Sequence, residues 1–159
     1  MRTKNNQKGF SLIELLIVVA IILIIAAIAI PNLLRSRMAA NEASAVGSLR
    51  TINTAQVQYA TTYQTGFSAS LTDLGGPAPA TSTQADLIDT VLAAGVKSGY
   101  TFTYTPGTAD TAGNINDYTI TAEPVTIGAT GQRGFFTDQS GVIRGDADAS
   151  ADLNSTPIS

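Results

Sequence analysis

The sequence predicts an α+β protein in which one long N-terminal helix packs, by its second half, on a small antiparallel β-sheet head. Three observations support this fold class. An apolar run near the N-terminus continues into a stretch with helical periodicity, a glycine- and proline-rich segment follows, and the last third alternates apolar and polar residues. A period of 3.6 residues is typical of helices, whereas a period of two is typical of half-buried strands. With 159 residues, the chain has room for one ordinary domain.

Residues 1–9, MRTKNNQKG, are polar and basic and are typical of a cleaved cytoplasmic leader. An ordinary secretory signal has a small-residue cleavage site after its apolar run, but here the natural break lies before the run. We therefore expect the apolar run to remain in the processed chain. Basic residues before a membrane span tend to stay in the cytoplasm, so the long C-terminal part is expected to face away from it.

Residues 10–34 predict a transmembrane helix, because the only ionisable side chain among them is Glu14. At about 1.5 Å per residue, a helix of this length covers a hydrocarbon core of roughly 30 Å. Pro31 lacks a backbone donor and is expected to kink or locally open the helix near its end.

Residues 35–65 predict an amphipathic continuation of the same helix. Apolar and aromatic side chains recur there every three or four residues, and the predicted stripe comprises Ala39, Ala43, Val46, Leu49, Ile52, Gln56, Tyr59 and Tyr63. The two tyrosines at the end of the stripe lie on one helix face, and we expect them to pack in the core of the protein.

Residues 66–159 are expected to form the globular head, which contains the antiparallel sheet. A loop leads to a short helix over 84–94, with Thr83 and Asp86 at capping-box spacing and Gly95 placed to end it. Alternation then predicts half-buried strands at 100–104 and 118–122, and a hairpin that joins 134–138 to 141–145. The second half of the long helix is the expected cover for this sheet.

Glu14 needs an explanation, because a carboxylate in a bilayer costs about 2.5 to 3.5 kcal/mol near the centre and less near an interface. One interpretation is that Glu14, close to the membrane edge, simply reaches headgroups or water. In the other, cleavage between Gly9 and Phe10 creates an α-amine, ionisable near about pH 7.7 to 8.0, four residues before Glu14. The amine of one chain would then meet the carboxylate of the next, and both charges would be satisfied only by assembly.

The segments KGFSLIELLIVVA, from Lys8, and AAIAIPNLL, around Pro31, resemble the N-terminus of type IV pilins and pseudopilins. The resemblance implies cleavage after Gly9 by prepilin peptidase and N-methylation of Phe10. It also implies a homo-oligomeric helical filament in which the helices form the core and Glu14 pairs with the Phe10 amine of the neighbouring subunit. The precursor would reside in the inner membrane, and an assembly platform with its ATPases would extract it into a pilus at the cell surface.

On this resemblance we expect a major pilin, a structural subunit without enzymatic activity. A major pseudopilin of a type II secretion system, with a short periplasmic filament, is the nearest alternative, and a minor pilin is another. From a different class, a single-span membrane protein with a binding head would keep its leader and form no polymer. The chain has neither cysteine nor histidine, which excludes disulfides, thiolate metal sites and nucleophile–histidine catalysis.

The sequence departs from the family pattern in two places. Leu23 stands where family members often have a glycine at which the helix can melt, and no disulfide can close the C-terminal loop. In that loop Asp146, Asp148, Ser150 and Asp152 occupy alternate positions, a spacing that suits Ca²⁺, but the glycine and the final glutamate of an EF-hand are missing. We expect a solvated acidic tail and no cofactor; a calcium site similar to that of the major pseudopilins is the alternative.

Overall fold

The computed structural model describes residues 10–158, which divide into two compact units on either side of the Ser36–Arg37 bond. One helix, α1 (Leu12–Tyr63), belongs to both units and runs without a break through Pro31 and Gly47. The expected helix over residues 10–65 is thus confirmed to within two residues at each end. The leader, residues 1–9, lies outside the described residues.

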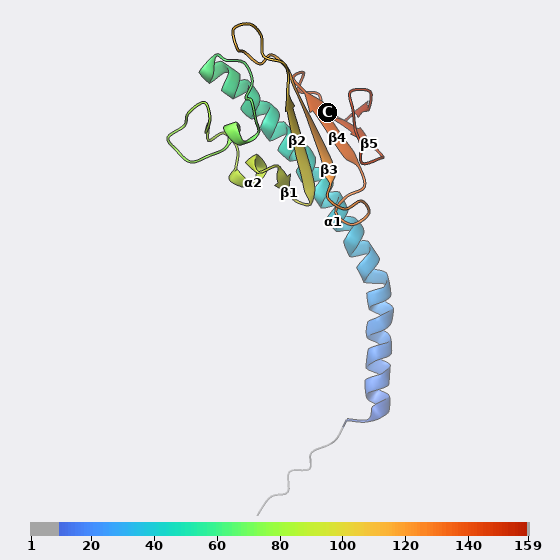
Figure 1. The fold of residues 1–159 in the computed structure, drawn as a ribbon. Helices are drawn as coiled ribbons and strands as arrows, with labels where there is room; N and C mark the ends of the chain where they lie inside the picture. Colours follow the sequence, from blue (N-terminus) through green and yellow to red (C-terminus); the bar gives the residue numbers. More distant parts are fainter. Residues whose placement is uncertain (1–9, 159) are drawn as a thin grey trace, which may run out of the picture. The chain divides into compact units, whose positions relative to one another are not determined.

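The second unit contains the rest of α1 and all of the other elements (Figure 1). Two short helical elements, η1 (Thr72–Leu74) and α2 (Thr90–Ala93), precede a six-stranded sheet. Each strand pairs antiparallel with the next along the chain, in the order β1 to β6. The strands are β1 (Val96–Lys97), β2 (Tyr100–Pro106), β3 (Tyr118–Pro124), β4 (Gly134–Asp138), β5 (Arg144–Asp146) and β6 (Thr156–Pro157).

The central ladder confirms the alternation of buried and exposed residues. Strands β2 and β3 pair over their whole length, with Phe102 opposite Ala122 and Thr103 opposite Thr121. The aromatic and aliphatic residues of both strands are buried, except for the partly buried Tyr104, while the threonines between them are mostly exposed. The expected hairpin is also present, because β4 pairs with β5 and Phe136 lies opposite Arg144.

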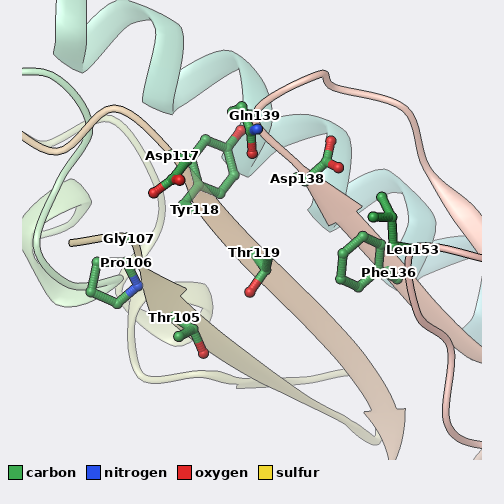
Figure 2. Close-up of a pocket in the computed structure, with 10 residues that line it drawn as sticks. All are labelled: Thr105, Pro106, Gly107, Asp117, Tyr118, Thr119, Phe136, Asp138, Gln139 and Leu153. Atoms are coloured by element: carbon green, nitrogen blue, oxygen red, sulfur yellow. The ribbon is translucent and has the colours of Figure 1, made fainter.

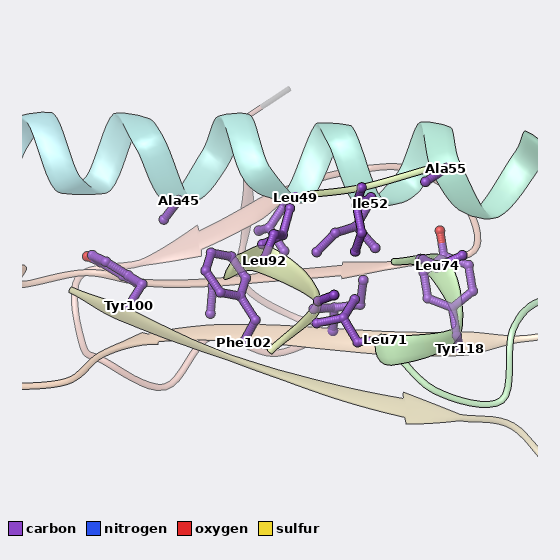
Figure 3. Close-up of a cluster of buried hydrophobic side chains, with 14 of the residues drawn as sticks. Ala45, Leu49, Ile52, Ala55, Leu71, Leu74, Leu92, Tyr100, Phe102 and Tyr118 are labelled. Carbon is purple, nitrogen blue, oxygen red and sulfur yellow. The ribbon is translucent and has the colours of Figure 1, made fainter. Parts of the chain in front are cut away.

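The core forms where the second half of α1 covers one face of this sheet. Leu49 and Ile52 are fully buried and point from the helix toward side chains of the sheet, among them Phe102 (Figure 3). Burying one such aliphatic side chain contributes about 1.5–3 kcal/mol. Tyr59 is also buried and its hydroxyl donates to the carbonyl oxygen of Ser82 at 2.7 Å, while its ring lies 4.8 Å from that of Tyr63. The expected core packing of these two tyrosines is therefore confirmed.

The predicted apolar stripe of α1 is wrong at its N-terminal end. Ala39 and Ala43 are exposed, and Ala45 is instead the first fully buried alanine of α1. An alanine gains little from burial, so periodicity alone cannot tell which alanine of a run faces the sheet.

The predicted helix over 84–94 is also wrong in its first half, since α2 begins only at Thr90. The backbone N–H groups of Ala85 and Leu87 donate to carbonyl groups of the η1 segment, which draws this stretch away from helical bonding. The cap is Asp89, whose carboxylate accepts from the N–H of Leu92 at 2.9 Å. Gly95, with a φ of +79°, follows the helix as predicted.

Candidate functional site

The first turn of α1 holds the carboxylate that the sequence singles out. Phe10 precedes the helix and is 81% exposed. The Glu14 Oε2 atom accepts a hydrogen bond from the backbone N–H of Ser11 at 2.9 Å, and the Ser11 hydroxyl oxygen accepts from the N–H of Ile13 at 3.4 Å. Glu14 therefore folds back onto the start of its own helix.

This arrangement is a capping box, in which a serine and a glutamate three positions later satisfy free N–H groups at a helix terminus. The Ser-x-x-Glu spacing of Ser11 and Glu14 is visible in the sequence and is the signal from which it could have been predicted. A negative charge in the first turn is also favoured by the helix dipole. The capping box thus offsets part of the cost of keeping Glu14 in an apolar segment.

The Glu14 carboxylate retains capacity for a second partner. An ionised carboxylate has two oxygens and about four lone-pair sites. Within residues 10–158, the Glu14 side chain accepts only the bond from Ser11, and Oε1 has no partner. Chemically, the site can therefore accept a cation without giving up its cap.

Between Leu12 and Leu34 the helix presents an exposed apolar surface. Every leucine, isoleucine and valine from Leu12 to Leu34 is at least 42% exposed. In the described part of the chain, α1 is the one helix that is both long enough and apolar enough to cross a membrane. No residue in its most apolar stretch is buried. This surface is suited to lipid or to other apolar helices.

The other predicted site residues of this region lie as follows. Pro31 lies inside α1, 17 residues after Glu14 in the sequence. Gly9, half of the expected cleavage junction, lies outside the described residues, so the structure presents only Phe10 of that pair.

Two acidic side chains of the C-terminal loop lie within hydrogen-bonding distance of one serine hydroxyl group. The hydroxyl of Ser155, which is buried, lies 3.2 Å from a carboxylate oxygen of Asp146 and 3.3 Å from one of Asp152. Asp148 contributes backbone groups, with its N–H donating to Asp146 and its carbonyl accepting from Gly134. Across residues 10–158 no three acidic side chains are gathered as a metal ion would require. Sequence reasoning missed Ser155, for which the chain offers no local signal.

Glu42 joins α1 to the loop before β4. Its carboxylate accepts from the backbone N–H groups of Gln132 and Arg133 and forms an ion pair with the Arg133 guanidinium at 3.0 Å. Burial raises the pKa of Glu42, but these hydrogen bonds and the guanidinium charge outweigh it and hold the pKa below its ordinary value.

Comparison with known proteins gives one family match near the N-terminus and relatives that are similar over part of the chain. The family described as "Prokaryotic N-terminal methylation motif" matches residues 4–30. The type IV wide pilus major component PilA4 of Thermus thermophilus is 66% identical over 38 residues, which are 24% of this chain and 29% of that protein. The type IV major pilin protein PilA of Myxococcus xanthus is 45% identical over 58 residues, 36% of this chain and 26% of that protein.

The family match over residues 4–30 contains most of the apolar part of α1 and the residues around Glu14, so it overlaps the candidate site. The chain spans less than a third of the length of each of these two relatives. No solved structure matches the chain.

Proposed function

Because the N-terminal segment of this chain supports membership of the type IV pilin family, we propose that the protein is the major structural subunit of a type IV pilus. The single observation that supports the proposal most directly is Glu14. It is the one ionisable side chain among residues 10–34, an exposed apolar segment, and it lies beside the terminus that a cleavage at Phe10 would create.

In the proposed mechanism, cleavage between Gly9 and Phe10 leaves a positive α-amine at the end of the apolar segment. Before assembly, the Ser11 capping box stabilises Glu14 within its own chain. On assembly, the Phe10 amine of a neighbouring subunit pairs with the Glu14 carboxylate. Both charges lie in apolar surroundings, so neither is well satisfied at any other axial offset of the two helices.

Glu14 thereby sets the register of the filament. Apolar helices that pack through leucine, isoleucine and valine alone have little to stop them from sliding past one another, whereas one buried polar contact selects a single offset. The exposed residues between Leu12 and Leu34 supply the packing surface, and the Glu14 pair supplies the offset.

The proposed partners follow from these roles. Prepilin peptidase cleaves the leader, and an inner-membrane assembly platform with its ATPases supplies the energy of extension. The protomer is stored in the inner membrane through α1 and works outside the cell as part of a homo-oligomeric filament. The contribution of this chain is assembly and not catalysis.

The test compares Glu14→Ala with Glu14→Gln in the full-length protein. A glutamine can still accept the Ser11 hydrogen bond of a capping box, but it carries no charge. Breaking a buried ion pair costs about 3–5 kcal/mol, so both variants should lower the yield of sheared filaments by more than about tenfold. The amount of processed protein in the membrane should stay near that of the wild type.

Glu123→Gln is the matched control, because it removes one carboxylate from an exposed position on β3 of the second unit. This variant should give normal filaments. A normal filament yield from Glu14→Gln would contradict the charge-pairing mechanism.

A further inference from the structure

The second unit has two distinct ends along its part of α1. Arg37 lies at one end and is exposed; one helical turn later, the Asn41 amide donates to the carbonyl oxygen of Thr130 at 2.7 Å. The other end of α1 adjoins the loop between β2 and β3, where the N–H of Phe67 donates to the carbonyl oxygen of Ile115 at 2.7 Å. From Arg37 to Tyr63 the helix extends roughly 40 Å at its usual rise.

An acidic hollow lies near the end marked by Ile115. It has a volume of about 500 Å³ and opens beside the ends of β2, β3 and β4 (Figure 2). Asp117 and Asp138 supply two carboxylates, and no lysine or arginine is among the lining residues. Pro106, Phe136 and Leu153 supply apolar surface, and Leu153 is 56% exposed.

Among residues 10–158, no ion pair neutralises the charges of these two ends. Over residues 10–158 the structure contains two ion pairs, Lys97–Asp89 and Arg133–Glu42. Arg37 and the carboxylates of the acidic hollow belong to neither. The basic end and the acidic hollow are thus complementary in charge and lie too far apart to meet within one copy.

We infer that, in the filament, the Arg37 end of one copy docks in the acidic hollow of the next copy. This inference rests on the proposed function and adds to it a contact made by the second unit. An exposed arginine at one end and an acidic hollow near the other give a heterologous contact, which is repeated by every subunit and generates an open polymer.

The chemistry of the acidic hollow suits an arginine in particular. Carboxylates can bind the planar guanidinium group, while the side chains of Pro106 and Leu153 can cover its apolar stem. Electrostatic complementarity of this kind selects partners and orientation more than it adds affinity. The contact therefore favours copies of this chain over other subunits that share the apolar helix.

The first test is a charge swap in full-length protein expressed in cells. Asp117 is the acidic residue of choice, because it is exposed and its side chain makes no hydrogen bond with a described residue. Arg37→Asp and Asp117→Arg should each lower the yield of sheared filaments by roughly fivefold or more, and the combined variant should recover to within about twofold of the wild type.

Glu123→Arg makes the same charge change on the sheet but outside the acidic hollow, and it should leave the yield within about twofold of the wild type. Normal yields from both single variants, or a combined variant that does not recover, would overturn the inference.

Cross-linking tests the same contact without relying on yield. The chain has no cysteine, so Arg37→Cys with Asp117→Cys places thiols only at the two surfaces. A short bifunctional maleimide should then produce a ladder of multimers in filaments, whereas Arg37→Cys with Glu123→Cys should not. Cross-links to a different protein, or no ladder, would contradict docking between copies.

The two proposals fail in different ways. If the wild-type chain forms no filaments, the proposed function is wrong. If wild-type filaments form, but the Arg37 and Asp117 variants behave like the Glu123 controls in both tests, only the docking inference is wrong.

Discussion

Substitutions of Ser11 and Glu14 can distinguish two functions at the start of α1, namely capping of the helix and charge pairing with a neighbouring subunit. The capping box needs a serine hydroxyl and a side-chain acceptor, whereas the proposed pairing needs a negative charge. Ser11→Ala removes the N-cap and should destabilise the helix start by about 1 kcal/mol. Because Glu14 keeps its charge, sheared filaments should still form at a yield within about twofold of the wild type. A loss as large as that of Glu14→Ala would mean that the cap, and not the charge, is what assembly requires.

Gly9 governs the proposed processing step through its size. Gly9→Leu places a bulky side chain next to the bond to be cut and should leave uncleaved precursor in the membrane. Gly9→Ala, the conservative partner, should still be processed. Immunoblots of membrane fractions separate the two lengths of chain. Processing of Gly9→Leu at the wild-type rate would contradict the assignment of the junction.

Glu42 makes the stability of the second unit depend on pH. Its pKa is lowered in the folded state, so its stabilisation is present above the unfolded pKa of about 4.3 and is lost as the pH falls through the folded pKa. Glu42→Gln should lower the free energy of unfolding by about 1–2 kcal/mol at pH 7, and the difference from the wild type should shrink below about pH 4.

Unfolding of the full-length protein in detergent, followed by tyrosine circular dichroism, measures this difference. Glu123→Gln is the control, since the Glu123 carboxylate makes no hydrogen bond with any residue from 10 to 158. If Glu42→Gln lowered the free energy of unfolding equally at pH 3 and pH 7, the stabilising role of the Glu42 charge would be contradicted.

At the scale of the element, replacing two glycines of the second unit by alanine is expected to change the free energy of unfolding in opposite directions. Gly47 lies inside α1, and a Cβ added there meets no described atom within 4 Å. Gly47→Ala should therefore raise the free energy of unfolding by about 0.5–1 kcal/mol, because glycine is the poorer helix former.

Gly134 begins β4, where a Cβ would collide with the backbone carbonyl of Ala149. Gly134→Ala should be destabilising, since the C-terminal loop would have to move away from the sheet. The same unfolding measurement in detergent compares the two variants. A stabilised Gly134→Ala protein would contradict the close packing of this loop.

Elements with a strong local signal were predicted from the sequence, and those formed by distant contacts were not. The long helix and the strands around Phe102 and Ile120 follow from hydrophobic periodicity, which is a local property. Strands β1 and β6 have two residues each, too few for a period to show. The first half of the expected 84–94 helix was lost to hydrogen bonds with η1, residues that the local pattern does not include.

The same distinction holds for the candidate site. Glu14 and Phe10 stand out in the sequence because they are a charge and a junction in an apolar run. Arg37 and Asp117 are 80 positions apart, and only the fold reveals that they lie at opposite ends of one unit. Ser155 likewise gains its position between Asp146 and Asp152 from the pairing of β5 with β6.

At the scale of the whole molecule, the two units have different roles in the proposed polymer. Residues 10–34 supply an apolar helical segment with one charge, Glu14, and the second unit supplies a packed sheet with the two surfaces proposed to dock. In the proposed filament, the Glu14 pair sets the offset of the helices and the Arg37 contact orients the second unit. Removing either contact should weaken assembly without unfolding the subunit.

The most direct test of this account is the intact mass and abundance of the protein in filaments sheared from cells, compared with the membrane fraction left behind. We expect an abundant sheared species that begins at a methylated Phe10. The same processed mass found only in membranes would point to a pseudopilin. A chain that begins near Met1, with no polymer, would contradict the filament account altogether.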